Sequence, residues 1–219
     1  MVHPKLVIFD CDGVLVDTES IANARLAELI TEAGLPMTMT ECRKRFVGLS
    51  MRTVCERLLC EDGIDLGGDF VDRWNENLPE LFDSGVQAVA DVEIAIDTIR
   101  NAGIPMCVAS SGRVEKMRLT LGLTGLLPHF ENVLFSASMV ERGKPFPDLF
   151  LHAASEMGHK PVDCVVIEDS PAGVQAGIRA GMKVFGYAGD PLTDAEGLGT
   201  SGAVIFDDMR QLPELLGLR

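Results

Sequence analysis

Short apolar runs recur along the chain, and stretches with helix-like patterns separate most of them. Apolar runs of this length, bounded by polar or turn residues, are typical of buried β-strands. Six of them are predicted as strands: Lys5–Phe9, Pro105–Ser110, Asn132–Phe135, Asp163–Glu168, Lys183–Tyr187 and Ala203–Phe206. Between strands, Asp91–Ala102 and Pro171–Ala180 have the start residues of helices, and a glycine follows each. This alternation predicts an α/β fold with a mostly parallel, doubly wound sheet.

Between the first and second predicted strands, the part of the chain from Thr18 to about Phe82 contains no strand-like run. Its apolar residues recur at helical spacing in four stretches: Ile21–Ala33, Thr40–Phe46, Ser50–Leu59 and Asp69–Phe82. We therefore expect an α-helical cap inserted into the α/β core, with linkers near Val14–Thr18 and Ser84–Ala90. The expected division is residues 1–16 and 86–219 for the core and residues 17–85 for the cap.

Composition and charge narrow the classes of partner. The chain of 219 residues has 47% hydrophobic residues and a net charge of −14, which argues against nucleic acid or an anionic membrane. No apolar stretch approaches the roughly 18–20 residues of a membrane helix, and the N-terminal apolar run is too short for a secretory signal. The six cysteines lack metal-site spacing, so we interpret them as reduced thiols of a cytoplasmic protein.

Candidate chemistry begins where the first predicted strand ends. Asp10 and Asp12 follow the apolar run and are spaced i, i+2, so both side chains lean the same way at its carboxyl end. In open parallel sheets, ligands bind at this end of the strands. Two carboxylates about 4 Å apart repel by roughly 4 kcal/mol at an effective dielectric of about 20. A cation site nearby is therefore expected.

Other predicted strands also end in polar residues. Ser110, Ser111 and Gly112 follow the second strand, Glu168 and Asp169 close the fourth, and Lys144 lies upstream of the fourth. Oxygen ligands from Asp10, Asp12, Glu168 and Asp169 suit a hard cation such as Mg²⁺. The Ser110 hydroxyl, the N–H groups of Ser111 and Gly112, and the charge of Lys144 favour an anion. Together these groups predict a phosphoryl-binding site.

Two roles then follow for the first pair of acids. An aspartate can attack phosphorus and form an aspartyl-phosphate, and Asp10 is the better placed of the two. A second acid can protonate the leaving oxygen and later activate water, which is the role expected of Asp12.

The segment Asp10-Cys-Asp12-Gly-Val-Leu-Val-Asp17-Thr18, followed by Ser110, Lys144-Pro145 and Glu168-Asp169, resembles the four motifs of the haloacid dehalogenase superfamily in order and separation. The resemblance covers essentially the whole chain and, with the helical insertion, is closest to the subfamily with a C1 cap. It implies a Rossmann-like core, Mg²⁺, Asp10 as nucleophile, Asp12 as acid/base and Ser110 and Lys144 as phosphate ligands. It also implies Asp169, with Glu168, as metal ligands, and a metal bond from the Asp12 carbonyl.

Asp12 and the residues of the cap indicate which branch of the superfamily this chain resembles. Members that cleave carbon–halogen bonds or phosphonates lack the second Asp, whereas this chain has Asp12. The β-phosphoglucomutase branch is a closer alternative. Members of that branch have a histidine in the cap where this chain has Ala22. They have an arginine directly after the G-[VL]-S loop, where this chain has Met51, with Arg52 one position later. Their core lysine corresponds to Arg113.

The remaining resemblance is to sugar-phosphate phosphatases near 6-phosphogluconate phosphatase. We therefore expect a Mg²⁺-dependent phosphatase acting on a sugar phosphate or sugar-acid phosphate, with a phosphosugar mutase and a non-catalytic phosphate-binding protein as alternatives. Gly48, Ser50, Arg52 and Arg113 are predicted to contact the organic part of the substrate, with Ser111 and Gly112 beside it. The expected partner is this small metabolite, with neither nucleic acid nor membrane, and the expected state is a monomer, with a homodimer as the alternative.

Overall fold

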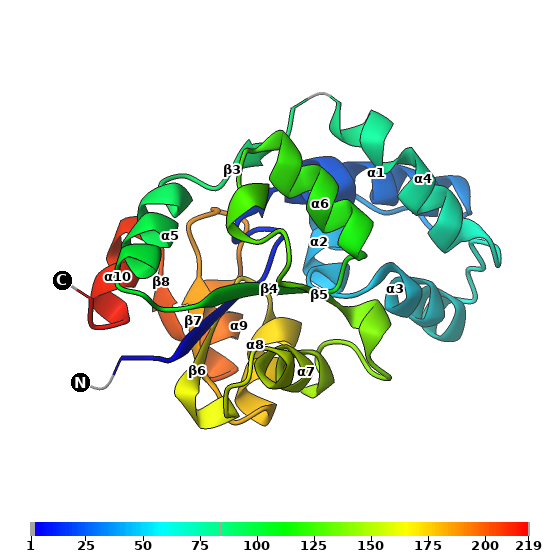
Figure 1. Ribbon diagram of the computed structural model, residues 1–219. Helices are drawn as coiled ribbons and strands as arrows, with labels where there is room; N and C mark the ends of the chain where they lie inside the picture. Colours follow the sequence, from blue (N-terminus) through cyan, green and yellow to red (C-terminus); the bar gives the residue numbers. More distant parts are fainter. Residues whose placement is uncertain (1–2, 84, 219) are drawn as a thin grey trace.

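A computed structural model describes residues 3–83 and 85–218. Its main sheet has six strands in the order β5-β4-β1-β6-β7-β8, and every pairing between them is parallel (Figure 1). The strands are β1 (Leu6–Phe9), β4 (Met106–Ser110), β5 (Leu134–Ser136), β6 (Cys164–Glu168), β7 (Lys183–Tyr187) and β8 (Val204–Phe206). Each coincides with one of the six predicted runs to within two residues at either end, and the predicted α/β fold class is confirmed.

Helices cover both faces of this sheet (Figure 1). On one face lie α5 (Val92–Asn101), α6 (Val114–Leu123) and α10 (Leu212–Leu215), and on the other α7 (Asp148–Glu156), α8 (Pro171–Arg179) and α9 (Ala195–Thr200). Because side chains alternate along a strand, β1 contributes Val7 and Phe9 to one core and Leu6 and Ile8 to the other. All four are fully buried, and each stabilises the fold by about 1.5–3 kcal/mol. The central position of β1 therefore fixes where its carboxyl end lies.

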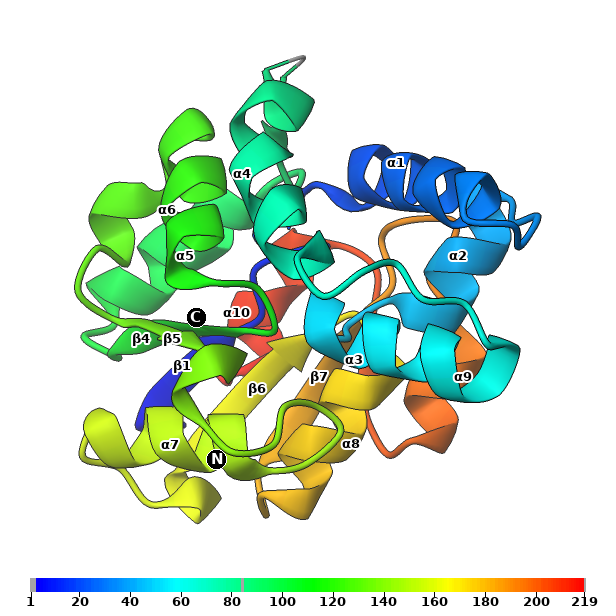
Figure 2. The same ribbon diagram turned by 90° about the vertical axis from the view of Figure 1, so that its right-hand side faces the viewer.

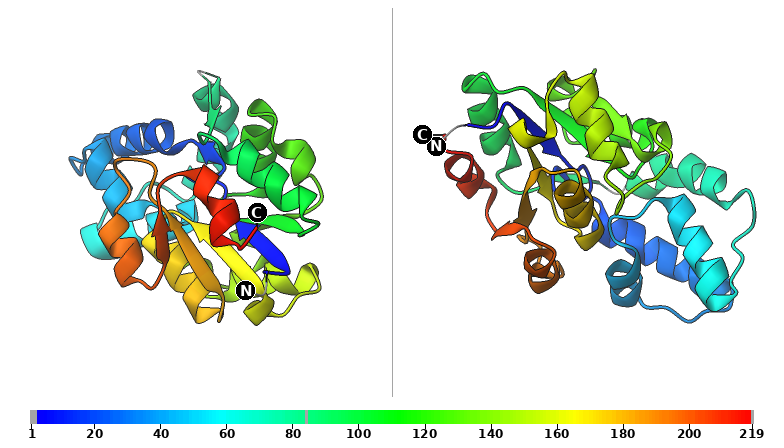
Figure 3. Two further views of the ribbon diagram at one scale, coloured as in Figure 1. Left: turned by 90° about the vertical axis from the view of Figure 1, so that its left-hand side faces the viewer. Right: turned by 90° about the horizontal axis from the view of Figure 1, so that it is seen from below.

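The chain between Thr18 and Asp83 forms helices, as its periodicity predicts. Its helices are α1 (Glu19–Glu32), α2 (Met39–Phe46), α3 (Met51–Arg57) and α4 (Phe70–Phe82), and a π-helical turn at Leu58–Asp62 extends α3. They enclose a third buried cluster that includes Ile30, Phe46 and Leu58. Figures 1 and 2 show the four helices gathered together, and Figures 1 and 3 place them opposite the chain termini. Near those termini, His3 Nδ1 lies 3.4 Å from the carbonyl oxygen of Leu216.

The two predicted linkers pair with each other. Strand β2 (Val16–Asp17) runs antiparallel to β3 (Gln87–Ala88), and Val89 N–H donates to the Leu15 carbonyl at 3.0 Å. Ser84, at the start of the second predicted linker, lies outside the described residues. The helical segment thus leaves and re-enters the α/β part through adjacent backbone strands, a contact that the linker composition does not predict.

Three contacts attach the helical segment to the carboxyl ends of the main strands. The Arg43 guanidinium on α2 pairs with Asp190 after β7, with Nη1 2.6 Å from Oδ2. The Ser111 hydroxyl donates to the Gly48 carbonyl at 2.8 Å, and Arg113 pairs with Asp72 of α4 at 2.7 Å. These contacts hold the helices against the strand ends.

Two properties of Gly48 allow its contact with Ser111: its backbone conformation and its lack of a side chain. Its φ of 76° is left-handed, and a Cβ there would overlap the side chain of Ser170. The loop after α2 can therefore lie directly on the β6–α8 turn. None of the helices in the described part of the chain is long and apolar enough to span a membrane.

The Arg43–Asp190 pair gives a test of this attachment. Arg43 is only 4% exposed, so Asp190→Ala leaves a buried charge without its partner. We expect the free energy of unfolding to fall by about 2–4 kcal/mol in chemical denaturation, with partial recovery when Arg43→Met is added. Arg113→Ala, which breaks the exposed pair with Asp72, is the control and should cost under about 1 kcal/mol. Equal losses in the two single variants would contradict the special role of the buried pair.

Candidate active site

The turn after β1 brings two acids from distant parts of the chain together. Asp10 is 4% exposed, and its N–H donates to the Ile167 carbonyl at 2.9 Å, which continues the pairing of β1 with β6. Gly13 then turns the chain with φ 76°, and a Cβ at this position would overlap the Asp169 carboxylate. Glycine is thus required both for the turn and for the close approach of Asp169.

Lys144 is the central cation of the site. Its Nζ donates to Asp10 Oδ1 at 2.8 Å and to Glu168 Oε1 at 2.6 Å, and its side chain is fully buried. The other oxygen of Glu168 accepts hydrogen bonds from Asp169 N, Ser170 N and Ser170 Oγ at 2.8–2.9 Å. Glu168 is therefore fixed on both oxygens, and it in turn fixes the Lys144 ammonium beside Asp10.

The acids of this cluster carry more negative charge than Lys144 offsets. Burial, together with the charges of Glu168 and Asp12, raises the pKa of Asp10 to about 7 despite the nearby Lys144 ammonium. Burial also raises the pKa of Asp169 well above its usual range, with Glu19 and Glu168 adding to the effect. For Lys144, burial alone lowers the pKa, but Asp10 and Glu168 reverse this and raise it. The cluster would be relieved by one more cation.

Three of the predicted metal ligands meet the geometric requirement for such a cation. Carboxylate oxygens of Asp10, Glu168 and Asp169 all lie within 4.8 Å of one another, and all three residues are buried. A donor set made of oxygen alone suits a hard cation. The Asp12 carboxylate is not part of this group. Its predicted contribution, through the backbone carbonyl, stays a prediction.

Asp12 is held separately from Asp10. Its Oδ1 accepts a hydrogen bond from the Thr18 hydroxyl and forms an ion pair with Lys116 Nζ at 2.8 Å. Burial raises the pKa of Asp12, but Lys116 and Thr18 more than offset this, and the net pKa is lowered. The sequence reasoning missed Lys116, because a single lysine in the first turn of α6 belongs to no recognised motif. Its position directly after the Ser110–Gly112 loop is the signal that was available.

Hydrogen bonds hold the Ser110–Gly112 loop, which follows β4, in place. Ser110 is 1% exposed, and its Oγ accepts from Gly112 N at 3.0 Å. The Ser136 hydroxyl donates to the Gly112 carbonyl at 2.7 Å, while Ser111 is directed to Gly48. The structure therefore brings Ser110, Ser111 and Gly112 to the same strand ends as the acids, as predicted from the parallel sheet.

The other four predicted substrate-contacting residues, Gly48, Ser50, Arg52 and Arg113, lie in different surroundings. Gly48 lies against the core, as described above. The Ser50 hydroxyl instead caps α3 by accepting from Thr53 N at 3.2 Å, and Arg52 is exposed on that helix. Arg113 is 45% exposed and paired with Asp72. Gly48 and Arg113 lie at the strand ends, whereas Ser50 and Arg52 belong to the start of α3. The substrate contacts of all four stay predictions.

Two further buried polar groups border the site. Glu19, at the start of α1, is 9% exposed and accepts from Asn23 Nδ2 at 2.6 Å. Among the described residues, Arg43 Nη2 is the one buried side-chain nitrogen or oxygen without a hydrogen-bond partner. The Arg43 charge partly offsets the rise in the pKa of Glu19 and of Asp169, which burial causes in both.

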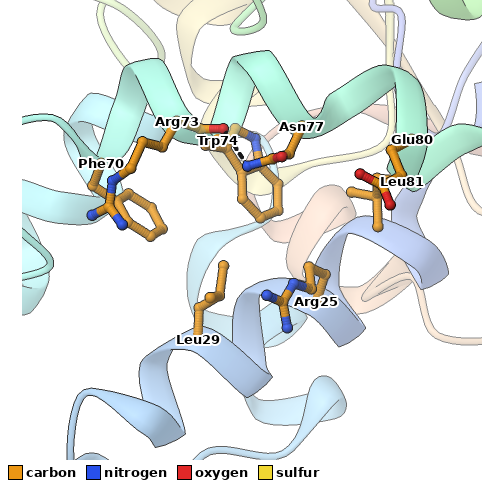
Figure 4. A pocket seen from close by; sticks show the side chains of 8 residues that line it. All are labelled: Arg25, Leu29, Phe70, Arg73, Trp74, Asn77, Glu80 and Leu81. Atoms are coloured by element: carbon orange, nitrogen blue, oxygen red, sulfur yellow. Dashed lines mark hydrogen bonds between the residues drawn. The ribbon is translucent and has the colours of Figure 1, made fainter.

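Two pockets border α4. One of about 440 Å³ lies between α1 and α4 within the helical segment, and Figure 4 shows Arg25 and Leu29 facing Trp74 across it. None of the acids at the strand ends lines it. The other, of about 400 Å³, lies between α4 and α6, and Lys116 and Arg113 are among its lining residues. Only this second pocket includes a residue that contacts Asp12.

Comparison with known proteins agrees with this arrangement. A relative from Escherichia coli K12, 6-phosphogluconate phosphatase, is 34% identical over 212 residues, covering 96% of this chain and 94% of that protein. A haloacid dehalogenase-like protein from Agrobacterium tumefaciens superposes with a TM-score of 0.79 at 33% identity and 97% coverage of both chains. A protein from Thermotoga maritima described as a putative β-phosphoglucomutase superposes with a TM-score of 0.72 at 26% identity, covering 97% of this chain and 98% of that one.

The family model for haloacid dehalogenase-like hydrolases matches residues 7–187, a range that includes Asp10, Asp12, Ser110, Lys144 and the Glu168-Asp169 pair. The match spans most of the chain and includes the ends of β1, β4 and β6, where the polar residues of the site lie. This protein belongs to the haloacid dehalogenase-like hydrolase family.

Proposed function

We propose that this protein is a Mg²⁺-dependent phosphatase that hydrolyses a phosphorylated sugar or sugar acid through an aspartyl-phosphate. The observation that carries the proposal is the different environment of the two aspartates. Asp10 lies on Lys144 among the buried acids, whereas Asp12 is bound by Lys116 and Thr18. Pairs of acids in contrasting environments are typical of sites in which one attacks and the other transfers protons.

The first step forms a bond between an Asp10 carboxylate oxygen and phosphorus. The bond from phosphorus to the leaving oxygen breaks, its electron pair stays on that oxygen, and Asp12 supplies the proton that yields the free alcohol. Without substrate, the pKa of Asp12 is lowered. The negative charge of an arriving phosphate group favours its protonated form, which is the form this step needs.

The second step releases phosphate. Asp12, now ionised, accepts a proton from a water molecule as the water oxygen attacks phosphorus. The bond between phosphorus and the Asp10 oxygen breaks, and the carboxylate is regenerated. Lys144, Ser110 and the loop N–H groups hold the phosphoryl oxygens in both steps.

Asp10 and Asp169 would hold the Mg²⁺ ion, together with the carbonyl of Asp12. Because Glu168 already accepts one hydrogen bond from Lys144 and three from the β6–α8 turn, its main contribution would be to orient Lys144 and the turn. When bound, the ion neutralises charge on the transferred phosphoryl group. The excess negative charge of the cluster supports this assignment.

Residues 17–85 are proposed as a cap that closes over a core of residues 1–16 and 86–219, and so excludes water from the reaction. The relative named 6-phosphogluconate phosphatase supports a sugar or sugar-acid phosphate as substrate. We place the protein in the cytoplasm as a monomer, with neither nucleic acid nor membrane as partner. A phosphosugar mutase is the second candidate, because the Thermotoga protein named above shares the fold.

Measurement of phosphate release separates these functions. The purified protein should release phosphate from p-nitrophenyl phosphate only with Mg²⁺, and chelation by EDTA should abolish the reaction. A panel of sugar phosphates, sugar-acid phosphates, phosphoglycolate and nucleotides then identifies the substrate. Conversion of β-glucose 1-phosphate to glucose 6-phosphate without phosphate release would favour the mutase. No turnover of any phosphate ester under these conditions would refute both enzymatic functions.

Replacing the nucleophile tests the covalent mechanism. Asp10→Asn should lower turnover by roughly 10³-fold or more, because the amide cannot attack phosphorus effectively. At pH 8 the thermal midpoint of the metal-free protein should not fall, since Asp10 is ionised there and the change removes one charge from a crowded acidic cluster. Acid-quenched wild-type enzyme given ³²P-labelled substrate should carry label that the variant lacks. A variant retaining most of the activity would exclude Asp10 as the nucleophile.

Replacing the proton donor should affect substrates unequally. Asp12→Asn should reduce kcat/KM by about 10²–10⁴-fold for a sugar phosphate, whose alkoxide leaving group needs a proton. The reduction for p-nitrophenyl phosphate should be much smaller, because nitrophenolate leaves without one. Steady-state kinetics on both substrates measure the ratio. A similar loss on the two would argue against Asp12 as the acid.

The raised pKa of Asp10 predicts how Mg²⁺ affects stability. In the metal-free protein this acid keeps a proton up to about pH 7, whereas in the unfolded chain it ionises near 3.8. Its contribution to stability is therefore present below about pH 4 and is lost as the pH rises to 7, by about 2–4 kcal/mol. Mg²⁺ should raise the thermal midpoint more at pH 8 than at pH 5. Asp10→Asn should reduce this difference, and equal stabilisation at both pH values would contradict the assignment.

A further inference from the structure

The two carboxylate oxygens of Asp12 have different surroundings. Oδ1 accepts a hydrogen bond from the Thr18 hydroxyl and forms an ion pair with Lys116 Nζ at 2.8 Å. No group among the described residues donates to Oδ2. This second oxygen lies on the side of Gly112, where a Cβ would be 3.9 Å from it and 3.4 Å from Ser110 Oγ. The free oxygen of Asp12 therefore borders the same small space as the Ser110 hydroxyl.

The donors to Oδ1 come from two separate elements. Thr18 directly precedes α1, and Lys116 lies in the first turn of α6. Both members of the Lys116–Asp12 pair are 16% exposed, so water screens the contact only partly. The Lys116 stem passes Gly112 so closely that its Cδ would be 3.2 Å from a Cβ there. A carboxylate bound from two directions has its position and plane fixed, whereas one bound at a single point can rotate.

We propose that Lys116 is a positioning residue, which together with Thr18 holds Oδ1 of Asp12 so that Oδ2 faces the phosphoryl group on the Ser110–Gly112 loop. The inference rests on the proposed function, because it concerns proton transfer by Asp12. It assigns the two lysines of the site to different tasks. Lys144 serves Asp10 and Glu168, and Lys116 serves Asp12.

Loss of a positioning residue and loss of a substrate-binding residue slow different reactions. If Lys116 acts through Asp12, its loss slows the departure of poor leaving groups and spares good ones. If Lys116 bound the phosphate itself, its loss would raise KM for every phosphate ester alike. The second-order constant kcat/KM is the quantity to compare, because it reports the steps up to loss of the leaving group and excludes hydrolysis of the aspartyl-phosphate.

The experiment uses the Mg²⁺-loaded enzyme and substituted phenyl phosphates, from p-nitrophenyl to unsubstituted phenyl. Lys116→Met keeps the length of the side chain and removes its charge. We expect kcat/KM to fall by about 10- to 100-fold for phenyl phosphate, part of the 10²–10⁴-fold that a general acid supplies, and by less than about threefold for p-nitrophenyl phosphate. Lys116→Arg should recover much of the loss. Lys160→Met, an exposed lysine far along the chain, is the control for the change in net charge and should behave as wild type.

A double-mutant cycle tests whether the two residues act together. Adding Lys116→Met to Asp12→Asn should change kcat/KM for phenyl phosphate by less than about twofold, because the acid that Lys116 positions is already absent. Multiplicative losses in the double variant would overturn the inference, as would equal losses on good and poor leaving groups. If Lys116→Met does not fold, Thr18→Val removes the other donor to Oδ1 and should give the same leaving-group pattern.

Failure of the proposed function has a separate signature. If wild-type enzyme with Mg²⁺ does not hydrolyse p-nitrophenyl phosphate, the phosphatase proposal fails. If it does, and neither Lys116→Met nor Thr18→Val shows a dependence on the leaving group, only the positioning role is refuted.

Discussion

The buried ammonium of Lys144, shared between Asp10 and Glu168, is the interaction on which the site depends. Taking a lysine and two carboxylates out of water is costly, and the cost is offset only when every polar atom finds a partner. The structure meets this requirement through the β6–α8 turn, whose N–H and hydroxyl groups donate to the second oxygen of Glu168. The central place of β1 between β4 and β6 then brings Asp10 to the ammonium. Sheet order, turn geometry and charge pairing thus converge on one atom, the Nζ of Lys144.

A second arrangement of the same kind separates the two aspartates after β1. They lie two residues apart, yet each has its own lysine, from a different element of the fold. Burial and neighbouring acids raise the pKa of Asp10, whereas Lys116 and Thr18 lower that of Asp12 below its ordinary value. The difference that the proposed roles of nucleophile and proton carrier require would therefore come from the partners of the two aspartates, since the side chains themselves are identical.

The sequence predicts the position of a site residue only when the secondary structure next to it fixes that position. Asp10, Ser110, Glu168 and Asp169 follow apolar runs directly, so the parallel sheet alone brings them to one edge. The pairing of Lys116 with Asp12 depends on the rotation of α6 about its axis, which no local pattern specifies. The same is true of Arg43 and Asp190, which are 147 residues apart.

In the helical segment, the sequence predicts the helices but not the contacts of their polar side chains. Its four helices follow from apolar periodicity, but the direction of individual polar side chains does not. Ser50 satisfies an N–H group at the start of α3, and Arg113 reaches across to α4. For a polar residue near a helix end, a local partner competes with any ligand, and the sequence alone does not show which one prevails.

The short ribbon of β2 and β3 has an evolutionary consequence. Because the chain enters and leaves the helical segment side by side, the span to be closed stays nearly the same whatever number of residues lies between. The entropy of closing a loop grows only slowly with its length, by about 0.6 kcal/mol per doubling. A change in the length of the helical segment therefore alters the entropy of closing it only slightly, provided that the pairing of β2 with β3 is kept. Under the proposed function, substrate range can diversify within residues 19–83 while the groups proposed for the chemistry, which lie outside that range, are kept.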